Sequence, residues 1–293
     1  MAALSTIPEL QGVNVAAITP RGNAGDVNFG ATFDLIDYLC AARVGGIAFF
    51  TAWGEYPALA VEDRARLVHL AVKRSRVPVL AGVGSATLDQ SLALAREARG
   101  AGAAAILVPP PLFYRYDEDD IHEFYSQFAA QLGAGIAIFL SGGIAAETAR
   151  TLLQTGLFAG IEDSNSVGPD AVYNGATLLV GDDSQFVPAR RAGLGVMSAV
   201  ACAAPELTMA LNRAVCAGDT ERVSSLEAMR QELMEWLARF AQPVGVKTAV
   251  AARGIKTGPL AVPLSPHKRK SLDEFREWFQ GWLPATKKVA AHG

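Results

Sequence analysis

Short apolar runs alternate with segments of helical periodicity along the first two thirds of the chain, and this alternation most narrows the possible folds. Nearly every run is followed by a segment whose apolar residues recur every three or four positions. Runs that are apolar on both faces are typical of a parallel sheet covered by helices. The eight runs cover residues 13–18, 46–50, 78–82, 104–108, 135–140, 158–162, 176–180 and 194–198. Because no run of adjacent hairpins interrupts the pattern, we predict an α/β fold with a closed eight-stranded barrel.

The strand pattern stops near Pro205, and the remaining chain predicts helices only. Aromatic residues at helical spacing, such as Trp236, Phe275 and Trp278, are typical of packing between helices. The predicted helices cover residues 206–216, 220–240, 245–253 and 271–282. The sequence therefore predicts a barrel over residues 1–204 and a carboxyl-terminal helical region over residues 205–293 that packs on it.

The composition excludes several classes of protein. With 51% hydrophobic and 19% charged residues, the chain is too apolar to be disordered. A net charge of −3 provides no basic field for nucleic acid. The chain has no run of membrane-spanning length and no signal-like amino terminus, and its three widely spaced cysteines indicate reduced thiols. We therefore expect a soluble cytoplasmic protein that binds a small molecule, with neither a nucleic acid nor a membrane as partner.

Six short motifs lie at defined places in this pattern. They are Thr-Ala-Trp-Gly-Glu at 51–55, Pro-Val-Leu-Ala-Gly-Val-Gly at 78–84, Val-Pro-Pro-Pro at 108–111, Gly-Ile-Glu-Asp-Ser at 160–164, Pro-Val-Gly-Val-Lys-Thr-Ala at 243–249 and Val-Pro-Leu-Ser-Pro at 262–266. In order and spacing they resemble the dihydrodipicolinate synthase and N-acetylneuraminate lyase family of pyruvate-handling aldolases, over essentially the whole chain. The resemblance implies a (β/α)8 TIM barrel with a C-terminal helical appendage, and a homo-oligomer that is a dimer or a tetramer.

Glu162 stands where the family has the lysine of its Gly-Ile-Lys-Asp-Ser motif. In the family, that lysine forms a Schiff base with a 2-oxo acid, and a carboxylate cannot form an imine. None of the seven lysines of the chain lies at the end of a predicted strand. We therefore predict that Schiff-base aldolase chemistry is absent, and we hypothesise that Glu162 is a catalytic acid/base.

Further departures surround the same predicted site. Ala52 and Trp53 occupy the positions of two family threonines that bind the carboxylate of the oxo acid and relay protons. The family's tyrosine on the fifth strand aligns with Leu140, or with Phe139 if the register slips by one residue. Ser141 begins a short loop where a longer family loop often carries a carboxylate-binding arginine. These positions are nevertheless the predicted substrate-binding residues, because they line the mouth of such a barrel.

Acidic side chains follow strands two, six and seven, whose carboxyl ends converge at one mouth of a barrel. They are Glu55, Glu162, Asp163, Asp182 and Asp183. Three interpretations are open. Like-charge repulsion and burial would raise the pKa of one carboxyl group and make it a general acid/base. Alternatively, Glu162, Asp182 and Glu55 would hold a divalent metal as hard oxygen ligands. Lastly, Glu55 and Asp183 would simply cap local turns.

Tyr114 and Ser198 complete the candidate substrate-binding set, and two roles are open for Trp53. Tyr114 follows the fourth strand and would replace a tyrosine that family tetramers lend across their interface. Trp53 would either fill the space left by altered side chains or stack on a flat substrate. Ser198 ends the eighth strand and would either line the cavity or form a local hydrogen bond.

The sequence thus predicts a diverged lyase of this family that acts on a small oxo-acid-like or aromatic compound, with no cofactor and with Glu162 as acid/base. Two alternatives remain. One is a metal-dependent lyase that uses the carboxylates of the mouth, and the other is a non-catalytic barrel that binds a ligand.

Overall fold

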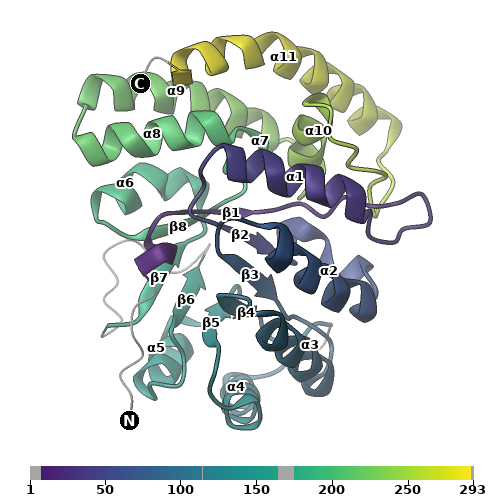
Figure 1. The fold of residues 1–293 in the computed structure, drawn as a ribbon, viewed down its shortest axis with the longest axis vertical. Coiled ribbons are helices and arrows are strands. Elements are labelled where there is room, and N and C mark those ends of the chain that lie inside the picture. Colours follow the sequence, from purple (N-terminus) through teal and green to yellow (C-terminus); the bar gives the residue numbers. More distant parts are fainter. Residues whose placement is uncertain (1–7, 114, 164–174, 292–293) are drawn as a thin grey trace.

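The computed structural model describes residues 8–113, 115–163 and 175–291 (Figure 1). Eight parallel strands form a closed barrel in sequence order, and β8 pairs with β1 to complete it. The strands are β1 Val13–Ala16, β2 Gly46–Phe49, β3 Val79–Gly82, β4 Ala105–Val108, β5 Ala137–Ser141, β6 Gly160–Asp163, β7 Thr177–Val180 and β8 Gly195–Ser198. The predicted (β/α)8 TIM barrel is confirmed.

Helices follow the strands and cover the outside of the barrel, as Figure 1 shows. They are α1 Phe29–Ala41, α2 Val61–Arg74, α3 Leu88–Ala101, α4 Glu118–Leu132, α5 Ala146–Gln154 and α6 Phe186–Arg191. Short 3-10 helices are η1 Pro8–Gln11, η2 Ala52–Gly54, η3 Tyr56–Ala58 and η4 Asp183–Gln185. The helical segment predicted near residues 169–173 lies outside the described residues.

The last part of the chain is helical and gathers on the side of the barrel where α1 lies (Figure 1). Its helices are α7 Val200–Ala203, α8 Pro205–Ala217, α9 Thr220–Leu237, α10 Val244–Ala252 and α11 Pro266–Ala291. Trp236 of α9 packs on Trp278 of α11 with ring centroids 5.5 Å apart, as expected of packing aromatics. Helix α11 begins earlier than predicted because Pro266 occupies its first position, where the missing N–H breaks no helical bond.

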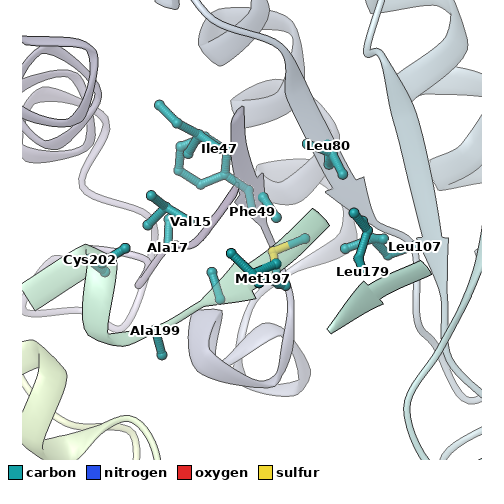
Figure 2. Packing of buried hydrophobic residues seen from close by; sticks show 14 of the residues in the cluster. Val15, Ala17, Ile47, Phe49, Leu80, Leu107, Leu179, Met197, Ala199 and Cys202 are labelled. Atoms are coloured by element: carbon teal, nitrogen blue, oxygen red, sulfur yellow. The ribbon is translucent and has the colours of Figure 1, made fainter. Parts of the chain in front are cut away.

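The core lies inside the barrel and between the strands and their helices. Figure 2 shows buried side chains from β1, β2, β3, β4, β7 and β8 gathered in this core. Nearly every strand residue is buried, which accounts for the apolar runs that predicted a parallel sheet. No helix within the described ranges has the length and apolar character needed to cross a membrane.

Candidate active site

A cavity of about 240 Å³ lies at the carboxyl ends of the strands. All eight strands, or the turns that follow them, contribute to its wall, because parallel strands of a barrel all end at the same mouth. The lining residues are Ala16, Phe50, Thr51, Ala52, Trp53, Tyr56, Gly82, Leu107, Pro109, Ser141, Gly142, Glu162, Gly181, Met197 and Gln242. The cavity therefore brings together four of the predicted site residues, namely Ala52, Trp53, Ser141 and Glu162.

Glu162 lies on the cavity wall near the end of β6 and is 8% exposed. The register of the sheet pairs it with Ser141 at the end of β5. The Ser141 hydroxyl donates a hydrogen bond of 2.8 Å to Oε2 of Glu162. A hydrogen bond to one oxygen orients a carboxylate and leaves acceptor capacity on the group. The hydrogen bond therefore orients the Glu162 carboxylate on the cavity wall.

The turn after β2 supplies the opposite wall. Ala52 and Trp53 form η2 and line the cavity, so neither residue restores the hydroxyls of the family threonines. Thr51, one residue earlier, also lines the cavity, and its buried hydroxyl oxygen has no hydrogen-bond partner among the described residues. The sequence analysis did not identify Thr51. The indication in the sequence was that Thr51 carries a hydroxyl group one position before Ala52, the first of the two residues that align with the family's threonines.

Tyr56 is a second lining residue that the sequence analysis missed. The centre of the Arg64 guanidinium group lies 5.0 Å from the centroid of the Tyr56 ring, and Arg64 donates hydrogen bonds to the carbonyl oxygens of Gly82 and Gly84. Burial raises the pKa of the Tyr56 phenol, and the Arg64 charge opposes this increase only in part. The phenol therefore stays protonated at neutral pH and can act as a proton donor. The sequence could have indicated Tyr56 as a site residue, because it directly follows Gly54-Glu55 of the strand-two motif.

A second cavity, of about 390 Å³, adjoins the first. Trp53, Gly181 and Gln242 line both cavities. The other lining residues are Asp182, Asp183, Ala199, Val200, Met234, Leu237, Ala238 and Phe240. This second cavity lies between the mouth of the barrel and the end of α9, and it contains the predicted site residue Asp182.

Asp183 and Ser198 form a structural network beneath the second cavity. Ser198 is 1% exposed, and its hydroxyl donates to Oδ1 of Asp183. Oδ2 of Asp183 accepts from the backbone N–H groups of Ala199 and Val200 at 3.0 and 3.1 Å, which caps α7. The buried Arg230 of α9 donates to the same carboxylate at 2.9 Å. Ser198 lines neither cavity, and the described contacts give it a local hydrogen-bonding role.

Glu55 likewise lines neither cavity, although the sequence analysis predicted it to bind substrate. Its Oε2 lies 2.6 Å from Nζ of Lys247, and its Oε1 accepts from the Ala261 N–H at 3.0 Å. Lys247 also donates to the carbonyl oxygen of Pro259 at 3.1 Å. Burial lowers the pKa of Lys247, while the hydrogen bond and charge of Glu55 raise it. The pair joins the turn after β2 to α10 and the loop that follows.

The remaining predicted residues lie around the site without lining the first cavity. Leu140 is fully buried in β5 on the face opposite to Ser141. Asp163 is 7% exposed at the end of β6. Asp182 lines the second cavity and caps η4 by accepting from the Ser184 N–H at 2.8 Å. Tyr114 lies outside the described residues.

The carboxylates do not assemble into a metal site in the described part of the chain. There, no group of three or more His, Cys, Asp or Glu side chains is arranged to hold a metal ion. Glu55 is engaged by Lys247, so the set of Glu162, Asp182 and Glu55 lacks one of its three ligands. None of the described lysines lines either cavity.

Comparisons with known proteins agree with this architecture. Residues 9–281 match the model of the dihydrodipicolinate synthetase family. An uncharacterised DapA-like lyase of Halobacterium salinarum is 31% identical over 87% of this chain and 88% of its own length. The 4-hydroxy-tetrahydrodipicolinate synthase of Azoarcus sp. is 28% identical over 88% of this chain and 93% of its own.

Solved structures show the same similarity in three dimensions. The 4-hydroxy-tetrahydrodipicolinate synthase of Methylacidiphilum fumariolicum superposes with a TM-score of 0.83 at 25% identity, covering 95% of this chain and 99% of that one. A catalytic lysine mutant of the sialic acid aldolase of Ruminococcus gnavus shares the fold, with a TM-score of 0.82 at 19% identity, covering 96% of this chain and 99% of that one.

Proposed function

The chain belongs to the dihydrodipicolinate synthetase family, and we propose that it is a lyase of aldolase type that acts without a Schiff base on a small carbonyl compound, oxo-acid-like or aromatic. Glu162 is the catalytic acid/base in this proposal. One observation supports this proposal above all. Glu162, which the motif resemblance aligns with the family's lysine, lines the cavity at the mouth of the barrel and accepts a hydrogen bond from Ser141.

A carbonyl substrate without an imine needs a different way to stabilise the electrons of the broken bond. A proton donor at the carbonyl oxygen meets this need, because it neutralises the charge that develops there. Tyr56 carries the protonated phenol on the cavity wall, and Thr51 adds a hydroxyl group to the same wall. We assign Tyr56 as this donor, because neither Leu140 nor Phe139, the two residues that align with the family's strand-five tyrosine, carries a hydroxyl group.

The proposed step is the cleavage of a β-hydroxy carbonyl compound. The Glu162 carboxylate takes the proton of the β-hydroxyl group, and the bond between the α and β carbons breaks. The electron pair of that bond forms an enol, whose oxygen takes a proton from the Tyr56 phenol. The products are an aldehyde or ketone and an enol, and exchange of protons with water restores both side chains.

Two experiments test this proposal. Reduction with borohydride in the presence of pyruvate should leave the intact mass of the protein unchanged, and a mass increase on any lysine overturns the absence of a Schiff base. In parallel, a panel of β-hydroxy carbonyl compounds is screened for released aldehyde. Glu162→Gln should lower turnover by about 10²- to 10⁴-fold, the usual contribution of a positioned acid/base.

The matched control is Glu277→Gln, which makes the same chemical change at an exposed position of α11. It should turn over the panel at the wild-type rate. If the wild-type protein turns over no compound of the panel, the lyase assignment is overturned in favour of a barrel that only binds a ligand. Equal turnover by wild type and Glu162→Gln overturns the role of Glu162.

We also propose that the protein forms a homo-oligomer, in line with the expectation from the family resemblance. Sedimentation equilibrium measures the assembly, and a mass equal to that of a single chain at micromolar concentration contradicts it.

A further inference from the structure

Arg64 of α2 is a buried cation whose partners are not carboxylates. The residue is 3% exposed, and the ion pairs formed among the described residues do not include it. Its guanidinium group donates to the carbonyl oxygens of Gly84 and Gly82, at 2.8 and 3.0 Å. Burial lowers the pKa of Arg64 to about 10, so the group stays charged at neutral pH. Because a charge buried without a counter-ion costs free energy, the groups that it faces indicate its use.

The Arg64 charge faces two aromatic rings of the first cavity. The centre of the guanidinium group lies 5.0 Å from the centroid of the Tyr56 ring and 5.4 Å from that of the Phe50 ring. Both aromatic residues line the first cavity, whereas Arg64 does not. An aromatic face attracts a cation, and the attraction is stronger where water is excluded. Arg64 therefore holds the Tyr56 ring from outside the cavity.

The backbone at the end of β3 encloses Tyr56 from another side. Gly82 is the last residue of β3, and Gly84 follows in the turn. A Cβ atom at Gly84 would lie 2.8 Å from both Oη and Cε2 of Tyr56, which is closer than Cβ atoms approach such neighbours. The phenol therefore fits against Gly84 because this residue has no side chain. The two carbonyl oxygens of this segment hold Arg64, so one guanidinium group connects the backbone beside the phenol to the ring itself.

The same charge acts on the phenolic proton. Burial raises the pKa of the Tyr56 phenol, and the Arg64 charge lowers it. Among the other titratable groups near Tyr56, Tyr125 of α4 is fully buried, and burial raises its pKa, so it stays neutral. Glu162 lines the same cavity, and Glu55 forms its ion pair away from that cavity. The positive charge of Arg64 therefore stabilises the phenolate that forms when Tyr56 gives up its proton.

We propose that Arg64 is a positioning residue for the reaction, which fixes the Tyr56 phenol at the cavity wall and stabilises the phenolate that remains after proton donation. Arg64 does not line the first cavity and acts through Tyr56. The inference rests on the proposed function in taking Tyr56 as the proton donor. Its effect on Tyr56 itself is measurable without a substrate.

Kinetics on a compound that is turned over from the β-hydroxy carbonyl panel test the positioning. Arg64→Met keeps the apolar bulk of the side chain and removes its charge and its donors. The value of kcat should fall by about tenfold or more, while KM changes by less than about threefold. In the Tyr56→Phe background the same change should lower kcat by less than about twofold, because the group that Arg64 positions is gone. A merely structural role would lower kcat equally in both backgrounds.

Two further variants make the test independent of one substitution. Arg64→Lys keeps the charge but lacks the planar fork that reaches two carbonyl oxygens, so its kcat should lie between those of wild type and Arg64→Met. It replaces Arg64→Met in both backgrounds if circular dichroism shows that Arg64→Met does not fold. Gly84→Ala keeps Arg64 and displaces the phenol, so it should lower kcat to within about threefold of Tyr56→Phe.

The matched control is Arg66→Met, which makes the same change two residues further along α2. Arg66 is exposed, and the centre of its guanidinium group lies 4.6 Å from the centroid of the Phe29 ring. The variant therefore also removes a cation from an aromatic ring, but away from the first cavity, which neither residue lines. It should keep the wild-type kcat.

The charge effect is measured on Tyr56 alone. Tyr56 is replaced by 3,5-difluorotyrosine, whose phenol titrates nearer to neutral pH, so that strongly alkaline conditions are avoided. In ¹⁹F NMR spectra over a series of pH values, Arg64→Met should move the titration to higher pH, because the lost charge no longer stabilises the phenolate. Arg64→Lys should titrate close to the wild type, and Arg66→Met should leave the titration unchanged.

The outcomes separate this inference from the proposed lyase activity. An unchanged titration in Arg64→Met overturns the inference, and so does an equal loss of kcat in both backgrounds. If no compound of the panel is turned over, the lyase is overturned, and the titration alone decides whether Arg64 controls the Tyr56 phenol. Turnover that Tyr56→Phe leaves unchanged overturns Tyr56 as the proton donor, and with it the role of Arg64 in the reaction.

Discussion

Glu55 and Glu162 are two carboxylates that follow strands of the same barrel, and they are almost equally buried, at 9% and 8% exposure. Glu55 is bound by Lys247 and by the Ala261 N–H, away from both cavities. Glu162 lines the first cavity beside the Ser141 hydroxyl. The two side chains are thus nearly equal in burial, and they differ in that Glu55 forms a buried ion pair whereas Glu162 lies on the cavity wall.

Glu55 has a structural role because its contacts join segments that lie far apart in the sequence. Its contacts connect the turn after β2 with Lys247 of α10 and with Ala261 in the following loop. The Glu162 region instead joins two neighbouring strands through Ser141. We therefore expect changes near Glu55 to affect stability and changes near Glu162 to affect chemistry.

The largest expected effect comes from Lys247→Met, which breaks the Glu55 pair and leaves its carboxylate buried. The free energy of unfolding should fall by about 3–5 kcal/mol, the usual cost of removing one partner of a buried ion pair. Urea unfolding followed by circular dichroism measures it. A loss below about 1 kcal/mol contradicts a structural role for the pair.

The double variant Lys247→Met with Glu55→Gln is the control for this prediction. It removes both charges, so a large part of the lost stability should return, because no unpaired buried charge remains. If the double variant is as unstable as the sum of the two single variants, the two side chains are not coupled.

The next effect concerns Tyr56, which lines the cavity of Glu162 although it directly follows Glu55 in sequence. Its pKa in the folded state is raised above the value of 10.0 for the free side chain. Below pH 10 the phenol is protonated in both states and stability is unaffected. Above pH 10 only the unfolded state releases the proton, so stability falls as the pH rises, by up to about 1.4 kcal/mol per pH unit.

Tyr56→Phe removes this contribution, so its free energy of unfolding should decline less steeply than that of the wild type between about pH 10 and pH 11. Burial also raises the pKa values of Tyr38 and Tyr125, which stay in both proteins as a common background. Urea unfolding at a series of pH values compares the two slopes. Parallel slopes contradict a buried, protonated phenol at the cavity.

A smaller effect is expected for Ser141→Ala, which removes the hydroxyl that donates to Glu162. The net loss of stability should be about 1 kcal/mol, the usual contribution of one hydrogen bond. Ser224→Ala, at an exposed position of α9, is the matched control and should be neutral. A loss comparable to that of Lys247→Met contradicts the contrast between the two regions.

The smallest expected effect on stability is that of Glu162→Gln, which keeps the shape of the side chain and removes its charge. Under the proposed function Glu162 serves the reaction and contributes little to stability, so the free energy of unfolding should change by less than about 1 kcal/mol. Thermal unfolding of the variant beside the wild type measures the change. A loss of about 3 kcal/mol or more gives Glu162 the same structural role as Glu55.

Much of the fold could be predicted from the sequence, because strands that are buried on both faces consist of continuous apolar runs. The apolar runs predicted eight parallel strands, and the barrel contains them. Boundaries were less accurate. The sixth strand was predicted at residues 158–162 but is Gly160–Asp163, because Phe158 packs against Tyr125 of α4 outside the strand. A buried aromatic residue has the same hydrophobic signal in either place.

The site was less predictable than the fold. Alignment of motifs brought Glu162, Trp53 and Ser141 to one mouth, and the structure places all three on the first cavity. Alignment missed Tyr56 and assigned Glu55 to the substrate. The two are sequence neighbours, and the left-handed backbone of Glu55, with φ of 52°, separates their side chains between Lys247 and the cavity.

The pattern of apolar runs and the short motifs were enough to predict a barrel of the dihydrodipicolinate synthetase family, because both signals lie in neighbouring residues of the chain. The ion pair of Glu55 became visible only in the three-dimensional structure. Glu55 meets an ammonium group 192 residues further along the chain, and Glu162 meets a serine on the neighbouring strand. The charge environment of a side chain depends on such distant contacts, which no local pattern in the sequence records.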